Sequence, residues 1–411
     1  PAITLARDGF QVSERMREFL INAKNRAAAD PVGRALFYDE TGKPVPVGTV
    51  IRNEALAQTL ERIARQGPDA FYKGAHAEAL ASAVWAKTPG ARGMVAGDLA
   101  AYTARDRIAQ CGAYREYRIC GMGPPSSGAT TVYAILKQLE RFDLDALGPQ
   151  SVTFWHLFAE SQRLAYADRE LYLADPDFVQ VPVAGLTDPA YLAGRGALID
   201  PTRRLENVTA GTPPGPAQAR ADGDEPEENG TSHFVVIDRD GNAVSYTSTI
   251  EGSFGSGIMV GGFFLNNELT DFSFTPEANG KPVANRVEGG KRPRSSMSPT
   301  LVYGPDGKLL IAVGAAGGAT IPAQVSRALI GMLDFRLSVA EALALPVLFS
   351  PGDSISVEPG SSLEALIPQL QALGHTVSAR PMPLKSNAAQ RTSAGWVGAA
   401  DPRSEGGVAR E

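Results

Sequence analysis

The sequence predicts a layered α+β fold, on the basis of two strand hairpins and the helical segments around them. Strand-like runs surround glycine-containing turns at residues 231–250 and 300–313, which is the pattern of β-hairpins. Segments with apolar residues at helical spacing come before and after these hairpins. Hairpins flanked by helices in this way indicate stacked layers of sheet and helix.

Composition limits the class of protein. The chain has 411 residues, 43% hydrophobic and 20% charged, which is ordinary for a globular protein of two or three domains. A net charge of −6 without a basic stripe argues against nucleic acid as a partner, and no apolar run is long enough for a membrane span. The cysteine spacing matches no metal motif, and the glycine-rich residues 252–262 lack the phosphate-loop and dinucleotide patterns. We therefore expect no metal and no cofactor.

The first part of the chain is predicted to be a helical scaffold. Apolar residues recur at helical spacing in the segments 6–26, 53–65, 74–87 and 96–104. Two more helices are expected at 124–142, where Ser126 and Ser127 offer capping hydroxyls, and at 153–173. His156 lies on the second of these helices, where a lone histidine is more often a packing residue than a base.

Both cysteines lie in one predicted hairpin, residues 109–120. With Arg115 and Glu116 as a two-residue loop, Cys111 faces Cys120 at a position where two Cα atoms approach to about 4.5 Å. That distance allows a disulfide, and the alternative is two unrelated buried thiols. A disulfide would indicate an exported, oxidising location, periplasmic or secreted; a cytoplasmic location is the alternative.

The hairpin at 231–250 follows a polar segment, 211–230, that reads as loop. A three-residue connection at 239–241 places Thr231 opposite Thr249, whereas a two-residue connection places Thr249 opposite Ser232. In either register two threonines lie together where the loop meets the sheet.

Cleavage of the bond between Gly230 and Thr231 would make this threonine a self-contained nucleophile. Its new α-amine, with a pKa of about 7.7–8.0, can take the proton of its own hydroxyl. The alternatives are an ordinary surface turn and an N-glycosylation acceptor, since Asn229-Gly230-Thr231 matches that pattern.

Three further features are candidate binding groups. Glu268 and Asp271 are three residues apart and suit an ammonium group, although a solvated turn explains them equally well. Ser295 and Ser296 precede a strand and can donate to a carboxylate, or can simply form a turn. Residues 314–320 join a strand to the helix predicted at 321–334 through a glycine turn, whose amides would suit an oxyanion better than a phosphate because the turn has no lysine. Helices at 338–345 and 361–373 and a strand at 396–399 complete the pattern.

Motifs along nearly the whole chain resemble the γ-glutamyltranspeptidases, which are self-processing N-terminal-nucleophile hydrolases. In the second half they are Thr231–Val244, Ser253–Gly257, Leu265–Phe272, Lys291–Pro299 and Asp401–Ser404. In the first half they are Pro1–Phe10, Gly67–Gly74, Pro124–Gly128 and Ala165–Phe178. Several independent motifs in the family's order make the resemblance specific.

The resemblance implies a four-layer αββα sandwich built from two chains, a large subunit ending at residue 230 and a small subunit, residues 231–411, which associate as a heterodimer. It implies γ-glutamyl compounds such as glutathione as substrates and the following site. Thr231 is the nucleophile, Thr249 bonds it, Gly317 and Gly318 stabilise the oxyanion, Glu268 and Asp271 hold the α-amino group, and Ser295 and Ser296 hold the α-carboxylate.

The chain also departs from the family's pattern. The resemblance places Pro1 well inside the large subunit, so an arginine that binds the α-carboxylate and some central strands are expected to precede it. Glu251 occupies a position where many relatives have a substrate-binding asparagine, and the expected lid region, 279–291, has no tyrosine. The substrate could therefore differ. The alternatives are a glutaryl- or cephalosporin-type acylase of the same fold and a non-catalytic truncated remnant.

Overall fold

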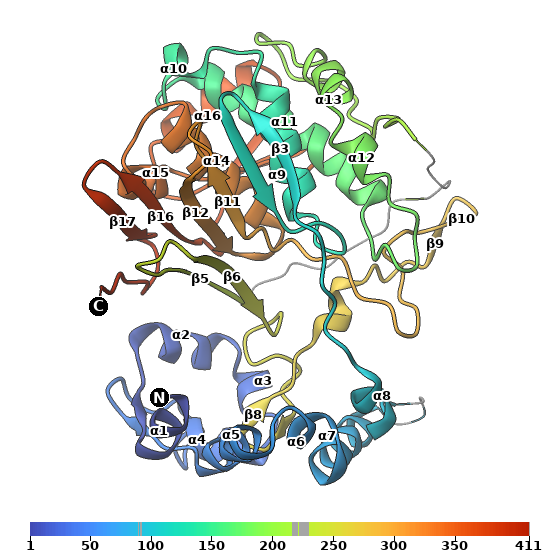
Figure 1. Cartoon of the computed structure of the whole chain (residues 1–411), viewed down its shortest axis with the longest axis vertical. Helices are drawn as coiled ribbons and strands as arrows, with labels where there is room; N and C mark the ends of the chain where they lie inside the picture. The colour runs from blue at the N-terminus through green and yellow to red at the C-terminus, as the bar shows by residue number, and fades with distance from the viewer. Residues whose placement is uncertain (89, 91–92, 216–220, 222–229, 411) are drawn as a thin grey trace. The chain divides into compact units, whose positions relative to one another are not determined.

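The structure is a computed structural model that describes residues 1–88, 90, 93–215, 221 and 230–410. The chain forms two compact units, residues 1–106 with 250–268 and residues 107–249 with 269–411 (Figure 1). This partition by packing is separate from the predicted division at residue 230, which concerns cleavage of the backbone. Within the described part of the chain, no helix combines the length and apolarity that crossing a bilayer requires.

The smaller unit is mainly helical. Its helices are α1 (Ala2–Asp8), α2 (Glu14–Asn22), α3 (Lys24–Ala27), α4 (Pro31–Phe37), α5 (Glu54–Gln66), α6 (Asp69–Tyr72), α7 (Gly74–Lys87) and α8 (Ala96–Ala101), and its strands are β1 (Phe10–Gln11), β2 (Val50–Ile51), β7 (Met259–Val260) and β8 (Phe263–Phe264). The predicted continuous helix at 6–26 is wrong. Gly9, at φ 107°, ends α1, and Ser13 caps α2 by accepting a hydrogen bond from the amide of Met16. A glycine at positive φ and a new N-cap divide what apolar spacing alone joins.

The larger unit is built on a six-stranded antiparallel sheet with the order β17-β16-β12-β11-β4-β3. Its strands are β3 (Gln110–Tyr114), β4 (Tyr117–Gly121), β11 (Thr300–Tyr303), β12 (Leu309–Ala316), β16 (Lys385–Thr392) and β17 (Gly395–Ala400). The β3–β4 hairpin has the expected two-residue loop, and a disulfide joins Cys111 to Cys120 across it.

A second sheet is the hairpin of β5 (Thr231–Ile237) and β6 (Ala243–Thr249). Its register pairs Thr231 with Thr249, as a three-residue connection predicts. The hairpin packs on the six-stranded sheet: Ser245 Oγ donates to the carbonyl of Val313 at 3.0 Å, and Asn387 Nδ2 donates to the carbonyl of His233 at 2.7 Å. These polar contacts hold the start of β5 against β12 and β16.

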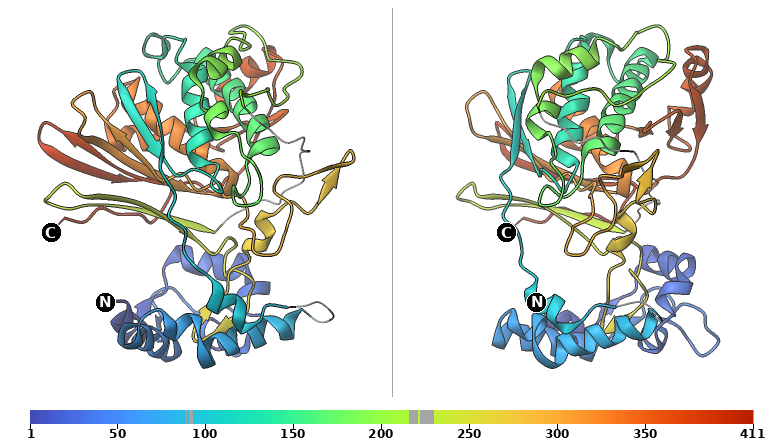
Figure 2. Two further views of the ribbon diagram at one scale, coloured as in Figure 1. Left: turned by 45° about the vertical axis from the view of Figure 1, so that its right-hand side comes forward. Right: turned by 90° about the vertical axis from the view of Figure 1, so that its right-hand side faces the viewer.

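Helices cover the other face of the six-stranded sheet (Figure 2). The three largest are α9 (Gly128–Leu139), α11 (Val152–Tyr172) and α14 (Ile321–Leu333), and smaller ones are α10 (Leu144–Leu147), α12 (Val183–Leu186), α13 (Pro189–Gly196) and α15 (Val339–Ala344). The main hydrophobic core lies between these helices and the sheet. His156 is buried on α11 and hydrogen-bonds His375 and the carbonyl of Asp200, as a packing residue does. Helices, six-stranded sheet and hairpin are three of the four layers that the resemblance implies, and the α+β class is confirmed.

Several boundaries differ from those predicted. The first core helix begins at Gly128 rather than at 124, and the predicted helix at 361–373 is a 3₁₀ turn, η3 (Glu364–Leu366), followed by α16 (Ile367–Ala372). The expected loop at 279–291 includes β10 (Lys281–Pro282), which pairs with β9 (Glu277–Ala278). Prediction missed β16 and a small sheet of β13 (Leu348–Phe349), β14 (Ser354–Val357) and β15 (Thr376–Ala379). Of the polar segment predicted as loop at 211–230, residues 216–220 and 222–229 lie outside the described residues.

Candidate active site

Thr231 lies at the edge of the hairpin sheet, where the strand begins. Its hydroxyl donates to the hydroxyl of Thr249 across the pair, with 3.3 Å between the two Oγ1 atoms. Thr231 is buried, and Gly230 on the other side of the predicted cleavage bond is half-buried. The two threonines that the sequence places together are therefore in contact.

His233 lies two residues further along β5 and fills the space between the two sheets. Its Nδ1 hydrogen-bonds Thr247 Oγ1 at 2.8 Å, and a Cβ added to Gly314 would lie 2.3 Å from the histidine ring. Burial lowers the pKa of His233 to about 4, so the ring is neutral near pH 7. A glycine on β12 is thus needed for the hairpin to pack this closely.

Lys385 also contacts the candidate nucleophile. Its Nζ donates to the carbonyl oxygen of Thr231 at 2.7 Å from the first position of β16. Sequence reasoning missed this residue, because β16 is polar and was not recognised as a strand. The register that brings it here pairs Lys385 with Ala316, next to the glycine turn.

The glycine turn has the backbone conformation that glycine permits. Gly317 and Gly318 have φ angles of 135° and 57°, between the end of β12 and the start of α14. A Cβ on Gly317 would lie 2.0 Å from the carbonyl oxygen of Pro383. The positive φ favours glycine at both positions, and lack of space for a side chain adds to this at Gly317.

Ser295 and Ser296 face different surroundings. The hydroxyl of Ser295 accepts from the amide of Met297 at 3.2 Å, and this residue is half-buried. Ser296 is 1% exposed, and its hydroxyl accepts from Nη2 of Arg169 at 2.7 Å. In each case the hydroxyl accepts a hydrogen bond from the protein and keeps its own proton for donation.

Arg169 is a buried cation that sequence reasoning did not select, although it lies in one of the family-like motifs. From α11 its Nε donates to Ser127 Oγ at 3.0 Å, and Ser127 donates through both its amide and its hydroxyl to the carbonyl of Ser295. Arg169 and Arg294 both contact the carboxylate of Glu170. Ser127 was expected to cap a helix, but its hydroxyl instead holds the serine segment.

The acidic candidates lie on one short element. The 3₁₀ turn η1 (Glu268–Asp271) carries one acid at each end, and Asp271 is buried. Asn285 Nδ2 donates to the backbone carbonyl of Asp271 at 2.7 Å. Glu251 belongs to the smaller unit, where it is buried at φ 68° and accepts a hydrogen bond from Asn267.

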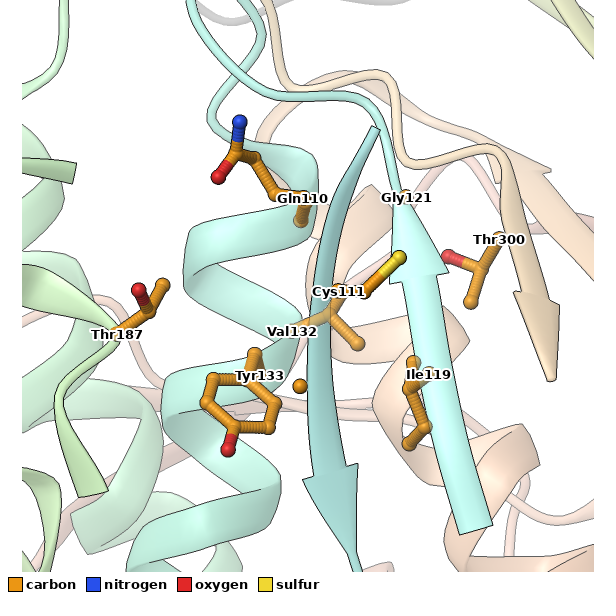
Figure 3. A pocket seen from close by; sticks show the side chains of 10 residues that line it. Gln110, Cys111, Ile119, Gly121, Val132, Tyr133, Thr187 and Thr300 are labelled. Carbon is orange, nitrogen blue, oxygen red and sulfur yellow. The ribbon is translucent and has the colours of Figure 1, made fainter. Parts of the chain in front are cut away.

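A small pocket elsewhere in the larger unit is separate from these residues. It lies between the disulfide hairpin and α9, with Tyr133 and Val132 facing Cys111 and with Thr187 at one side (Figure 3). A Cβ on Gly112 would lie 2.3 Å from the Tyr133 ring, so that ring packs directly on the strand. Apart from Cys111 of the predicted disulfide, the residues that line this pocket are not predicted site residues. Among the described residues, no group of three or more His, Cys, Asp or Glu side chains is arranged to hold a metal ion.

Comparison with known proteins identifies the family. The sequence model of the family described as gamma-glutamyltranspeptidase matches residues 1–410. The chain is 37% identical to a "Glutathione hydrolase proenzyme" of Escherichia coli K12, over 98% of this chain and 69% of that protein. It is 34% identical to an "Acylase ACY 1 proenzyme" of Pseudomonas sp. SE83, over 93% of this chain and 64% of that protein.

A solved structure supports the fold. The cephalosporin acylase of Bacillus halodurans superimposes with a TM-score of 0.84 at 24% identity, over 99% of this chain and 72% of that one. The family's sequence model, which matches residues 1–410, spans the paired threonines, the serine segment and the glycine turn. This chain belongs to the γ-glutamyltranspeptidase family.

Proposed function

We propose that this protein cleaves itself between Gly230 and Thr231 and then transfers γ-glutamyl groups from amides such as glutathione to water or to amino acids. The observation that carries the proposal is the position of Thr231. It begins a strand, its hydroxyl lies 3.3 Å from that of Thr249, and it belongs to a family-like motif. The relative named as a glutathione hydrolase proenzyme supports both the substrate and the processing.

In the proposed self-cleavage, Oγ1 of Thr231 attacks the carbonyl carbon of Gly230. A C–O ester bond forms, the C–N bond breaks, and the hydroxyl proton passes to the departing nitrogen. Water then hydrolyses the ester, which leaves a carboxylate on Gly230 and restores the hydroxyl. The products are the large and small subunits, which stay together as a heterodimer.

In each turnover the new α-amine of Thr231 takes the hydroxyl proton while Oγ1 attacks the γ-carbonyl of the substrate. The leaving amine departs with that proton, and the γ-glutamyl ester passes to water or to an amino acid. Amides of Gly317 and Gly318 stabilise the tetrahedral oxyanion, and Thr249 orients the nucleophile.

Substrate binding completes the proposal. Ser295 and Ser296 donate to the α-carboxylate, and Glu268 and Asp271 hold the α-amino group as an ion pair. Glu251 stands where the family's pattern has asparagine. We assign it to the side of the substrate's α-amino group, since a carboxylate next to the substrate's α-carboxylate would repel it. The disulfide supports an oxidising, exported location.

The direct test is intact-mass measurement and N-terminal sequencing after incubation near neutral pH, with Thr231→Ala as the control. Two fragments, the smaller starting at Thr231 and absent from the control, are expected. A single uncut chain in both samples would overturn the proposal and favour a non-catalytic protein.

An acylase of the same fold is the second candidate, because one relative is named an acylase and the acylase structure shares the fold. Glutaryl-type acyl groups lack the α-amine. We expect Glu268→Gln to reduce turnover of a γ-glutamyl anilide and to leave turnover of the matching glutaryl anilide unchanged. Faster turnover of the glutaryl anilide by the unaltered protein would support the acylase.

A further inference from the structure

We infer that Lys385 and Gln324 are positioning residues that hold the candidate nucleophile at a set distance from the glycine turn. The inference rests on the proposed function, because it assigns these two residues to the reaction of Thr231. It depends on a continuous series of hydrogen bonds between the two parts of the site, within the larger unit.

The first contact is between Lys385 and the nucleophile. Nζ of Lys385 donates to the carbonyl oxygen of Thr231 at 2.7 Å. A hydrogen bond from a charged donor contributes about 1.5–3 kcal/mol, which is more than the two neutral threonine hydroxyls contribute to each other. Because Thr231 begins β5, it has strand pairing on its C-terminal side only. The hydrogen bond from Lys385 to the carbonyl of Thr231 therefore limits displacement of Thr231, whose hydroxyl is the proposed nucleophile.

The second contact joins Lys385 to Gln324, a fully buried residue of α14. The Gln324 Oε1 atom accepts from the amide of Lys385 at 3.2 Å and from Ser386 Oγ at 3.1 Å. Loss of the Gln324 side-chain oxygen would leave these two donors unpaired inside the protein, which costs free energy. The start of β16 is thus anchored to the helix that follows the glycine turn.

The third contact joins Gln324 to that turn. Its Nε2 donates to the carbonyl of Ala316 at 3.0 Å and to Thr320 Oγ1 at 2.8 Å. Thr320 Oγ1 in turn donates to the carbonyl of Gly317 at 2.8 Å. One side-chain amide therefore bonds both sides of Gly317, and its other end bonds the lysine that holds Thr231.

The consequence is geometric. In acyl transfer the nucleophile and the oxyanion donors act on the same carbonyl group, so their separation must suit the tetrahedral intermediate. A displacement of about 1 Å can cost about 100-fold in rate. Neither residue needs to contact the substrate for this purpose, so its loss lowers kcat and leaves KM nearly unchanged.

The test compares Lys385→Met and Lys385→Arg with Lys308→Met, which makes the same change at an exposed lysine between β11 and β12. Intact mass first measures the processed fraction, and kcat, KM and Tm are then measured on processed protein with a γ-glutamyl anilide. We expect Lys385→Met to lower kcat about 10- to 100-fold with KM within twofold, Lys385→Arg to recover part of the loss, and Lys308→Met to match the unaltered protein. Gln324→Leu is expected to lower kcat in the same way.

Three outcomes would overturn the inference. An unchanged kcat in Lys385→Met would show that the contact does not matter. A rise in KM at constant kcat would make Lys385 a substrate ligand, and a lower Tm with normal kcat would make it a purely structural residue. If Lys385→Met fails to fold, Lys385→Arg and Gln324→Leu still decide the matter, because kcat and KM are read separately for each of them. If the unaltered protein is processed and active and Lys385→Met behaves like it, this inference alone is refuted. If the unaltered protein is inactive, the proposed function is refuted as well.

Discussion

Replacing Arg169 with methionine tests whether a buried cation supports carboxylate binding. The guanidinium is 2% exposed and donates to the hydroxyls of Ser127 and Ser296 at 3.0 and 2.7 Å. Each such bond contributes about 1.5–3 kcal/mol. Taking the lower value twice, we expect the free energy of unfolding to fall by about 3 kcal/mol, a loss that a domain with 5–15 kcal/mol survives.

The effect on activity should depend on the substrate. A hydroxyl that accepts a hydrogen bond from a cation is polarised and is a stronger donor, so Ser296 depends on Arg169 for its strength and its orientation. Loss of one hydrogen bond to a charged carboxylate lowers kcat/KM by about 10- to 150-fold. A 4-aminobutanoyl anilide has the amine and the scissile amide of the γ-glutamyl anilide but lacks the carboxylate. Its kcat/KM should stay near that of the unaltered protein.

The assay is the ratio of kcat/KM for these two anilides, measured for the unaltered protein, Arg169→Met and Ser296→Ala. We expect the ratio to fall in both variants, and a double variant to lose little more than either single one, since the two groups act through one bond. Arg163→Met, which removes another buried arginine of α11, is the control for stability alone. Equal losses on both anilides would refute the reasoning and leave Arg169 with a structural role only.

Three further expectations follow from local geometry. Gly317→Ala should destabilise the protein by about 2–4 kcal/mol and lower turnover, because the new Cβ meets a carbonyl oxygen at 2.0 Å and φ is 135°. The control is Gly307→Ala, at φ 71° with open space around it. It should lower the Tm in a thermal melt by less than Gly317→Ala does. The lowered pKa of His233, about 4 against 6.5 when unfolded, means that the unfolded chain binds more protons between these values. Stability should therefore fall as pH drops from 6.5 to 4, by up to about 3 kcal/mol from this residue, and urea titrations of His233→Asn should show a smaller fall. Removing the Cys111–Cys120 disulfide, whose sequence separation is 9, should cost about 2–3 kcal/mol by loop entropy, and urea unfolding of Cys111→Ser that matches the unaltered protein would contradict this.

Local rules predicted the parts of the fold that depend on neighbouring residues. The two-residue turn of the cysteine hairpin predicted Cys111 opposite Cys120, and Thr231 opposite Thr249 was one of the two registers that the sequence left open for the other hairpin. The glycine turn could be recognised because strand, glycines and helix follow one another. Apolar spacing failed at residues 6–26, where Gly9 at positive φ interrupts it.

What could not be predicted depends on packing between distant segments. The strand β16 (Lys385–Thr392) has mostly polar residues, yet it lies between two other strands of the main sheet. Without that strand, no signal places Lys385 beside Thr231, more than a hundred residues earlier in the sequence. Arg169 had one usable signal, its place in the family-like motif Ala165–Phe178. That Arg169 donates to Ser296 is known only from the fold.

The contacts around Ser295 and Ser296 do not by themselves separate the two candidate reactions. A γ-glutamyl group and a glutaryl group both end in a carboxylate, and serine hydroxyls supported by Arg169 suit either one. The two groups differ in the α-amine, which only the γ-glutamyl group has. In the proposed site, Glu268 and Asp271 lie at the two ends of one short turn, and two carboxylates there attract the ammonium group that only the γ-glutamyl substrate carries. We therefore propose that substrate preference depends on the acidic turn rather than on the serines.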